Sequence, residues 1–272
     1  MIDDVRFEIS FKDLSGLEKK LKFCTTNKIN KINIPCKGTI KKKFLDETFE
    51  YINKNYNEID IVYHYSLFHQ FSKNTDLSYS NLLKFIIKCY CNKNHEILLI
   101  SGSSKKKNFE VIEVMNYLKK EKIKNLNLGI AYNPYLKNHF NVSDERERFE
   151  KKFSTGLISS IWLQFGTDIS TLKKEIIFLR KYIKKNGILY KNKSIKIFGS
   201  LLIPSRQFIS RFRFRPWKEV YISENYLCSL SRFDNFIKEL ADFYVDNGIH
   251  PVIETDFDSH EKLEKIYNLF KS

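Results

Sequence analysis

The sequence predicts an α/β chain folded as a (β/α)8 TIM barrel, a single domain that spans residues 1–272. Short apolar runs alternate with amphipathic stretches eight times, as the strand and helix pairs of parallel barrels do. The length of 272 residues fits the roughly 250 residues of a typical barrel. No internal repeat or low-complexity linker divides the sequence into two domains.

Strands are expected where apolar residues alternate with polar ones or form short continuous runs. The seventh carries Gly199, which we expect to break it, and Pro204 closes it. In chain order the expected strands are residues 5–11, 29–36, 59–65, 96–100, 126–132, 158–165, 194–203 and 250–255.

Helices are expected in the amphipathic stretches between these strands. Asp168 is the expected N-cap of the helix that follows the sixth strand. The expected helices are residues 14–22, 40–55, 77–91, 109–121, 144–153, 169–185, 206–217, 233–247 and 261–270.

The charge of the chain points to an anionic partner. The 47 Lys and Arg against 32 Asp and Glu leave a net charge of +15, which suits phosphate groups, a polyglutamate tail or nucleic acid. The segment 206–217, RQFISRFRFRPW, alternates arginine with phenylalanine and would suit base stacking. However, the lysines are scattered through every segment, which favours a generally solvated surface. Nucleic acid is therefore the less favoured partner.

The spacing of the cysteines and the length of the apolar runs indicate the cellular compartment of the protein. The five cysteines are odd in number, and Cys89 and Cys91 are closer together than the pairs of common zinc knuckles. We expect reduced thiols and no metal. The first residues are acidic, and no run approaches the roughly 20 apolar residues of a membrane span. These features predict a soluble, cytoplasmic protein with no membrane partner.

Three polar side chains stand out in the predicted strands. Glu8 alternates with Phe7 and Ile9, so it faces the other side of its strand, where a carboxylate is costly unless paired or functional. The alternative is a glutamate at the strand edge, on the surface. His64 ends the third strand, where a hydrogen-bonded structural role is the commoner one. Gln164 lies near the carboxyl end of the sixth strand, where α/β barrels bind ligands. The alternative is a core amide satisfied by its neighbours.

Small residues follow the fourth strand. Gly102 between serines lets a ligand approach the backbone closely, and with the lysines at 105–107 it could hold phosphate. Neither a Walker motif nor GxGxxG is present.

Several stretches at the strand ends carry a family pattern in their order and spacing: Phe7–Ser10 (FEIS), His64, Ala131–Tyr132 before Pro134, Lys152 before Gly156, Gln164–Phe165 with Asp168, and Gly199–Pro204. Together they resemble the methylenetetrahydrofolate reductase family, whose catalytic domain is a barrel with flavin and folate at its mouth. The resemblance implies Glu8 as the general acid, Gln164, Phe165 and Gln207 as substrate-binding residues, and His64, Gly102, Ser103, Tyr132 and Lys152 as cofactor-binding residues.

Two positions depart from the family pattern. Where the family has Arg-Gly-Asp after the fourth strand, this chain has Ser101-Gly102-Ser103, so the aspartate beside the flavin is missing. The last strand, VIETDF, lacks the Thr-Leu-Asn-Arg motif and its substrate-binding arginine.

The resemblance implies a reductase that converts 5,10-methylenetetrahydrofolate to 5-methyltetrahydrofolate. Its implied cofactors are NADH or NADPH and FAD, its substrate is a folate, and a homo-oligomer is compatible with it. Glu8 would protonate the folate amine while the methylene bridge opens. Two alternatives stay open: a folate-dependent methyltransferase barrel, and a non-catalytic basic barrel that binds nucleic acid.

Overall fold

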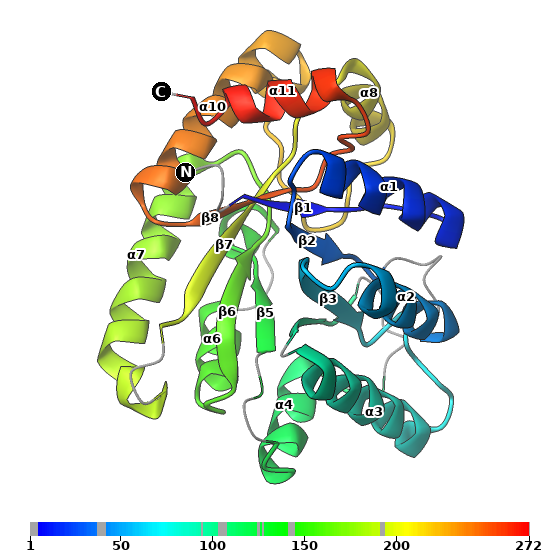
Figure 1. Cartoon of the computed structure of the whole chain (residues 1–272). Coiled ribbons are helices and arrows are strands. Elements are labelled where there is room, and N and C mark those ends of the chain that lie inside the picture. The colour runs from blue at the N-terminus through cyan, green and yellow to red at the C-terminus, as the bar shows by residue number, and fades with distance from the viewer. Residues whose placement is uncertain are drawn as a thin grey trace. The chain divides into compact units, whose positions relative to one another are not determined.

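The structure is a computed structural model that describes residues 5–36, 42–93, 95–102, 108–123, 126, 128–140, 145–190 and 194–271. Its parallel strands follow one another in chain order and close into an eight-stranded barrel with helices between them, which confirms the predicted (β/α)8 fold (Figure 1). The strands are β1 (Arg6–Glu8), β2 (Lys31–Ile34), β3 (Asp60–Ser66), β4 (Glu96–Ile100), β5 (Leu128–Tyr132), β6 (Ile158–Leu163), β7 (Lys196–Leu201) and β8 (His250–Ile253).

All the predicted helices form, and three short helical elements were not predicted. The latter are α5 (Leu136–Phe140), the 3-10 helix η2 (Gly187–Tyr190) and α9 (Glu224–Leu227), each too short to show a helical period. The others are α1 (Leu14–Thr26), α2 (Lys42–Asn55), α3 (Thr75–Lys93), α4 (Val111–Lys120), α6 (Glu145–Phe153), α7 (Ile169–Asn186), α8 (Arg206–Phe214), α10 (Leu230–Asp246) and α11 (His260–Asn268).

The contacts of the chain divide it into two compact units. The N-terminal unit comprises Arg6–Ile130 and Lys151–Ser159. The C-terminal unit comprises Met1–Val5, Ala131–Glu150 and Ser160–Ser272. The organisation of residues 1–272 as one domain therefore stays a prediction.

In the N-terminal unit, helices α1, α2 and α3 lie along one side of strands β1 to β3 (Figure 1). Tyr63 of β3 faces this helical side, because its ring centroid is 5.4 Å from that of Phe49 in α2 and 5.8 Å from that of Phe85 in α3. Successive side chains of a strand point to opposite faces, so His64 points away from the helices. Glu8 does the same, since Phe7 and Ile9 on either side of it are buried.

In the C-terminal unit, Gly199 does not break the seventh strand as we had expected. Strand β7 runs through it, and the glycine serves packing instead. A Cβ at position 199 would lie 2.4 Å from the ring of Tyr244 in α10, and the Tyr244 hydroxyl donates to the Ser200 carbonyl at 3.2 Å. The missing side chain thus lets a buried tyrosine lie against the strand.

Several helices begin at a polar side chain that binds the first free backbone amides. The predicted cap of α7 is confirmed, because the Asp168 carboxylate accepts from the Thr171 amide at 2.9 Å. The other side chains that cap in this way are Asp13 for α1, Ser205 for α8, Ser229 for α10 and Ser259 for α11.

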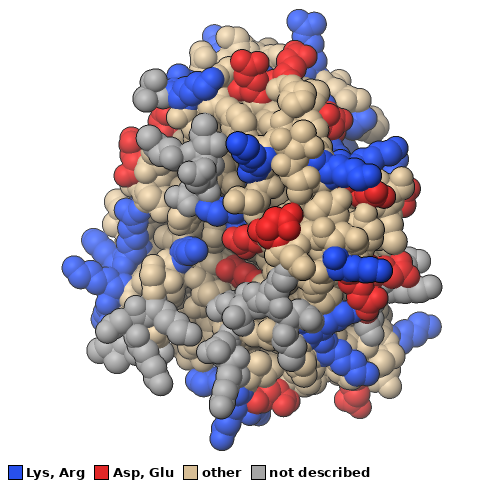
Figure 2. All heavy atoms as spheres, in the orientation of Figure 1, with Lys and Arg blue, Asp and Glu red and all other residues tan. Residues whose placement is uncertain are grey.

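Surface charge is dispersed on the face seen in Figure 2. Lys and Arg side chains are spread over that face with Asp and Glu among them, rather than gathered into one basic stripe. Among the described helices, none is both long enough and apolar enough to cross a membrane.

Candidate functional site

Glu8 and His64 come together at the carboxyl ends of β1 and β3 in the N-terminal unit. Glu8 Oε2 lies 3.9 Å from His64 Nδ1, and the two side chains are 9% and 11% exposed. This distance is longer than that of a hydrogen bond between the two groups. The structure thus joins a predicted acid and a predicted cofactor residue in one polar cluster.

A chain of polar side chains reaches this pair from the other end of the strands. Arg6, which is 4% exposed, donates to Asp60 Oδ2 at 2.8 Å, to the Ile32 carbonyl at 2.9 Å and, from Nε, to Asn33 Oδ1 at 3.0 Å. Asn33 is fully buried, and its Nδ2 lies 3.3 Å from His64 Nε2. We call Asp60, Arg6, Asn33, His64 and Glu8 the polar relay.

The polar relay fixes the proton on the imidazole. A guanidinium can only donate, so the atom of Asn33 that faces Arg6 must be the amide oxygen. The amide nitrogen therefore faces His64 and donates to Nε2. Nε2 then carries no proton, and the neutral ring holds it on Nδ1, directed toward Glu8.

Arg6 and Asn33 were not singled out from the sequence, although a signal exists for Arg6. It stands two residues before Glu8 and so points to the same face of the strand. Asn33 interrupts the apolar run of β2 just as Gln164 interrupts the run beside β6. A search for polar residues inside apolar strands would have found both.

Gln164 lies just past β6 in the C-terminal unit and is half-buried. Its backbone amide donates to the Tyr132 carbonyl at 2.9 Å, and its side-chain Oε1 accepts from the Phe165 amide at 3.1 Å. The amide oxygen is thus satisfied locally, which favours the alternative of a residue satisfied by its neighbours. Phe165 is fully buried, with its ring centroid 6.3 Å from that of Phe233 in α10, so it belongs to the core.

Tyr132 points into the packing between β5 and the helices of the C-terminal unit. Its hydroxyl donates to the Glu175 carboxylate in α7, which also binds the Arg146 guanidinium at 2.8 Å. Burial, together with the neighbouring Glu175, raises the pKa of Tyr132 well above its usual range. The side chain is held as a neutral donor within a buried network.

The other residues predicted to bind cofactor or substrate are not part of the polar relay. Gly102 has φ of +82°, and a Cβ there would lie 2.6 Å from Phe68 Cβ, so packing already requires a glycine. Lys152 lies half-buried in the last turn of α6, and Gln207 is exposed on α8. Ser103 and the lysines at 105–107 lie outside the described residues.

The alternating Arg and Phe segment 206–217 forms α8 and the turn that follows it, as expected. Phe212 is buried, and the ring centroid of Phe208 is 5.4 Å from that of Trp217. Phe214 and Trp217 are exposed, at 91% and 48%. Because Trp217 packs edge-on against Phe208, the two exposed rings form no continuous stacking surface.

No protein-family model matches this chain, and no curated protein matches its sequence. Similar solved structures include active domain 2 of a chitinase from Pyrococcus furiosus, 10% identical over 92% of this chain and 83% of that one, with a TM-score of 0.46. Another is 2,3-dimethylmalate lyase of the PEP mutase/isocitrate lyase superfamily, 9% identical over 97% of this chain and 85% of that one, with a TM-score of 0.46. Concanavalin B is 10% identical over 86% of this chain and 100% of its own, with a TM-score of 0.43. Similarities this distant transfer no activity.

Proposed function

We propose that this chain is a reductase that converts 5,10-methylenetetrahydrofolate to 5-methyltetrahydrofolate with a reduced nicotinamide. The observation that carries the proposal is the Glu8 carboxyl group, largely shielded from water at the carboxyl end of β1 beside His64. Barrel enzymes place their reacting groups at this end of the strands. The sequence resemblance assigns the acid of this reaction to the same residue.

The reaction needs a proton before it needs a hydride. Opening the methylene bridge breaks a carbon–nitrogen bond, and protonation of the departing amine by Glu8 leaves an iminium carbon able to accept hydride. A reduced nicotinamide would supply the hydride and be oxidised. A carboxyl group is a side chain that can give this proton by general acid catalysis.

His64 acts as a positioning residue in this scheme. Asn33 holds the imidazole neutral with its Nδ1–H toward Glu8, so the ring can support the carboxylate that remains after proton transfer. The ring does not need to gain or lose a proton itself. Arg6 in turn fixes the orientation of the Asn33 amide.

The described residues do not fit FAD as the resemblance assigns it. The Tyr132 hydroxyl is hydrogen-bonded to Glu175, and His64 Nε2 is hydrogen-bonded to Asn33. The space beside Gly102 is filled by Phe68 and Ser66. These groups therefore already contact other residues of the protein where the resemblance would have them contact FAD. FAD therefore stays a prediction, and no step of the scheme depends on it.

The test is nicotinamide oxidation by the purified protein in the presence of methylenetetrahydrofolate, compared with Glu8→Gln. We expect folate-dependent oxidation in the native protein and a kcat at least about 100-fold lower in the variant, as is usual for loss of a general acid. Glu18→Gln is the matched control, because Glu18 is a half-exposed glutamate that pairs with Lys22 on α1. It should keep full activity.

Two results would contradict the proposal. If the native protein binds the folate without oxidising nicotinamide, the methyl-transfer alternative is favoured. If Glu8→Gln retains its activity while its unfolding free energy drops, Glu8 is a structural residue only.

A further inference from the structure

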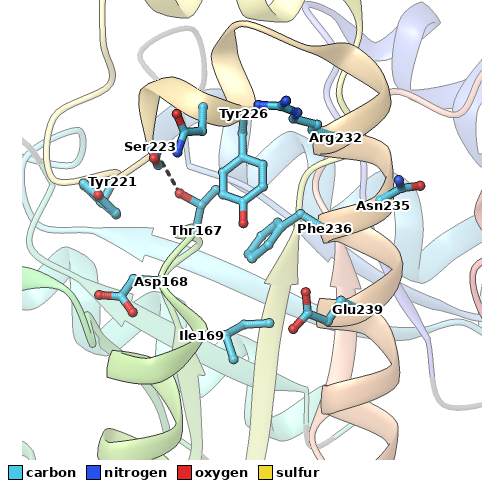
Figure 3. Close-up of a pocket in the computed structure, with 11 residues that line it drawn as sticks. Thr167, Asp168, Ile169, Tyr221, Ser223, Tyr226, Arg232, Asn235, Phe236 and Glu239 are labelled. Carbon is cyan, nitrogen blue, oxygen red and sulfur yellow. Dashed lines mark hydrogen bonds between the residues drawn. The ribbon is translucent and has the colours of Figure 1, made fainter.

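A pocket of about 540 Å³ lies in the C-terminal unit, beyond the carboxyl end of β6 (Figure 3). Its walls come from the start of α7, from α9 with the segment just before it, and from one face of α10. The volume falls within the range of about 300 to 1,000 Å³ typical of small-molecule sites. Among the described residues, none that the resemblance predicts to bind substrate or cofactor lines it.

Hydrogen bonds and a ring stack join two of these walls, the start of α7 and the segment just before α9. The Thr167 amide donates to the Tyr221 carbonyl at 3.0 Å, and the Ser223 amide donates to Thr167 Oγ1 at 2.8 Å, the bond drawn in Figure 3. The Tyr221 ring stacks on His139 with centroids 3.5 Å apart, and His139 Nε2 lies 2.9 Å from Asp168 Oδ2. A pocket with fixed walls loses little entropy when a ligand binds.

The middle of the pocket is aromatic. Figure 3 shows Tyr226 and Phe236 between the two ends, and their ring centroids are 4.7 Å apart. Burial raises the pKa of Tyr226, and the nearby carboxylate of Glu239 and the Tyr221 hydroxyl raise it further. This surface suits a flat apolar group such as a phenyl ring.

The ends of the pocket carry opposite charges. Arg232 and Glu239 lie at opposite ends of the view in Figure 3, seven residues apart on α10, which is roughly 10 Å along a helix. Both are exposed, and the structure gives neither charged group an ion-pair partner among the described residues. A ligand with a negative and a positive end could therefore meet both without displacing a protein partner.

We propose that this pocket binds short peptides that have free amino and carboxyl ends and an aromatic residue between them. The carboxylate would lie at Arg232, the ammonium group at Glu239 and the aromatic ring on Tyr226 and Phe236. Three extended residues span roughly 10 Å, which matches the separation along the helix. This inference does not depend on the proposed reductase activity.

The test is a titration of the full chain, followed by NMR, with the tripeptide Gly-Phe-Gly. Three derivatives each lack one feature: the N-acetylated form, the C-terminal amide, and Gly-Ala-Gly. The native protein should bind each derivative about threefold more weakly or worse, the size expected for one exposed charge or one stacked ring.

Two variants test which end of the peptide lies at which charged residue. Arg232→Gln should no longer distinguish the free carboxylate from the amide but should still distinguish the free amine from the acetylated form, and Glu239→Gln should do the reverse. Lys238→Gln is the matched control, since Lys238 is exposed on α10 but does not line the pocket. Native protein that binds no peptide, or binds all four alike, overturns the proposal, as does an Arg232→Gln variant that discriminates like Lys238→Gln.

Discussion

Arg6 and Glu8 lie in the polar relay of the N-terminal unit, whereas Arg232 and Glu239 lie on an exposed face of α10 in the C-terminal unit. The buried arginine donates to the side chains of Asp60 and Asn33 and to the backbone carbonyls of Ile32 and Asp60. The exposed pair has solvent around it. An arginine and a glutamate thus help to hold the structure rigid where they are buried, and they remain available to a ligand where they are exposed.

The largest effect on the unfolding free energy should come from replacing Arg6 by glutamine, compared with the same replacement of Arg232. Arg6→Gln should lower the unfolding free energy by about 3 kcal/mol, because Asn33 Oδ1 and the Ile32 carbonyl lose a charged donor in a buried place. Arg232→Gln should change it by no more than about 0.5 kcal/mol. Urea unfolding measures both values. Equal losses would remove the distinction between the two regions.

A smaller effect should follow from Asn33→Asp, which tests the direction of the polar relay. A carboxylate at position 33 accepts but cannot donate, so Nε2 of His64 must gain a proton that it does not carry in the native protein. The ring ¹⁵N shifts report the tautomer. His139 is the internal control, because its Nε2 faces Asp168 and should stay protonated in both proteins. An unchanged His64 spectrum would show that Asn33 does not set the tautomer.

The smallest effect concerns Asp168, a carboxylate in the pocket wall that has hydrogen-bond partners. Burial alone would raise its pKa, but hydrogen bonds from Thr171, His139 and Ser170 together hold the pKa well below the ordinary value of 3.8. A lowered pKa stabilises the fold above that value, and the stabilisation is lost as the pH falls below it.

Asp168→Asn should therefore lose roughly 1 kcal/mol at neutral pH and should have a flatter stability curve between pH 4 and 2. Thermal unfolding across this pH range measures the difference. A variant whose curve is as steep as that of the native protein would assign the acid sensitivity to other carboxylates.

The sequence predicted the barrel well because each strand is a local apolar pattern. All eight strands form, and β4 keeps its predicted bounds. Alternation along β1 also gave the correct face for Glu8. The role of Gly199 was misread, since a glycine that breaks a strand and one that admits a distant ring look alike in sequence, and Tyr244 stands 45 residues away.

The sites were harder to predict than the fold because they depend on contacts between elements. The link from Asn33 to His64 joins two strands, and that from Arg6 to Asp60 crosses 54 positions of the chain. The pocket combines the start of α7 with one face of α10, where Arg232 and Glu239 look like ordinary solvated charges in the sequence. No local pattern identifies such a face.

The contact between the Tyr244 ring and Gly199 also affects how α10 and β7 unfold locally. The ring lies against the strand, and its hydroxyl is bound to the next residue, so α10 cannot slide along β7 without breaking both contacts. Amide hydrogens of the two elements should then exchange with solvent as one cooperative unit rather than by separate fraying. Because Gly199 has no side chain to push the ring away, the contacts of Tyr244 would make the joint opening of α10 and β7 the slowest local motion of this part of the chain.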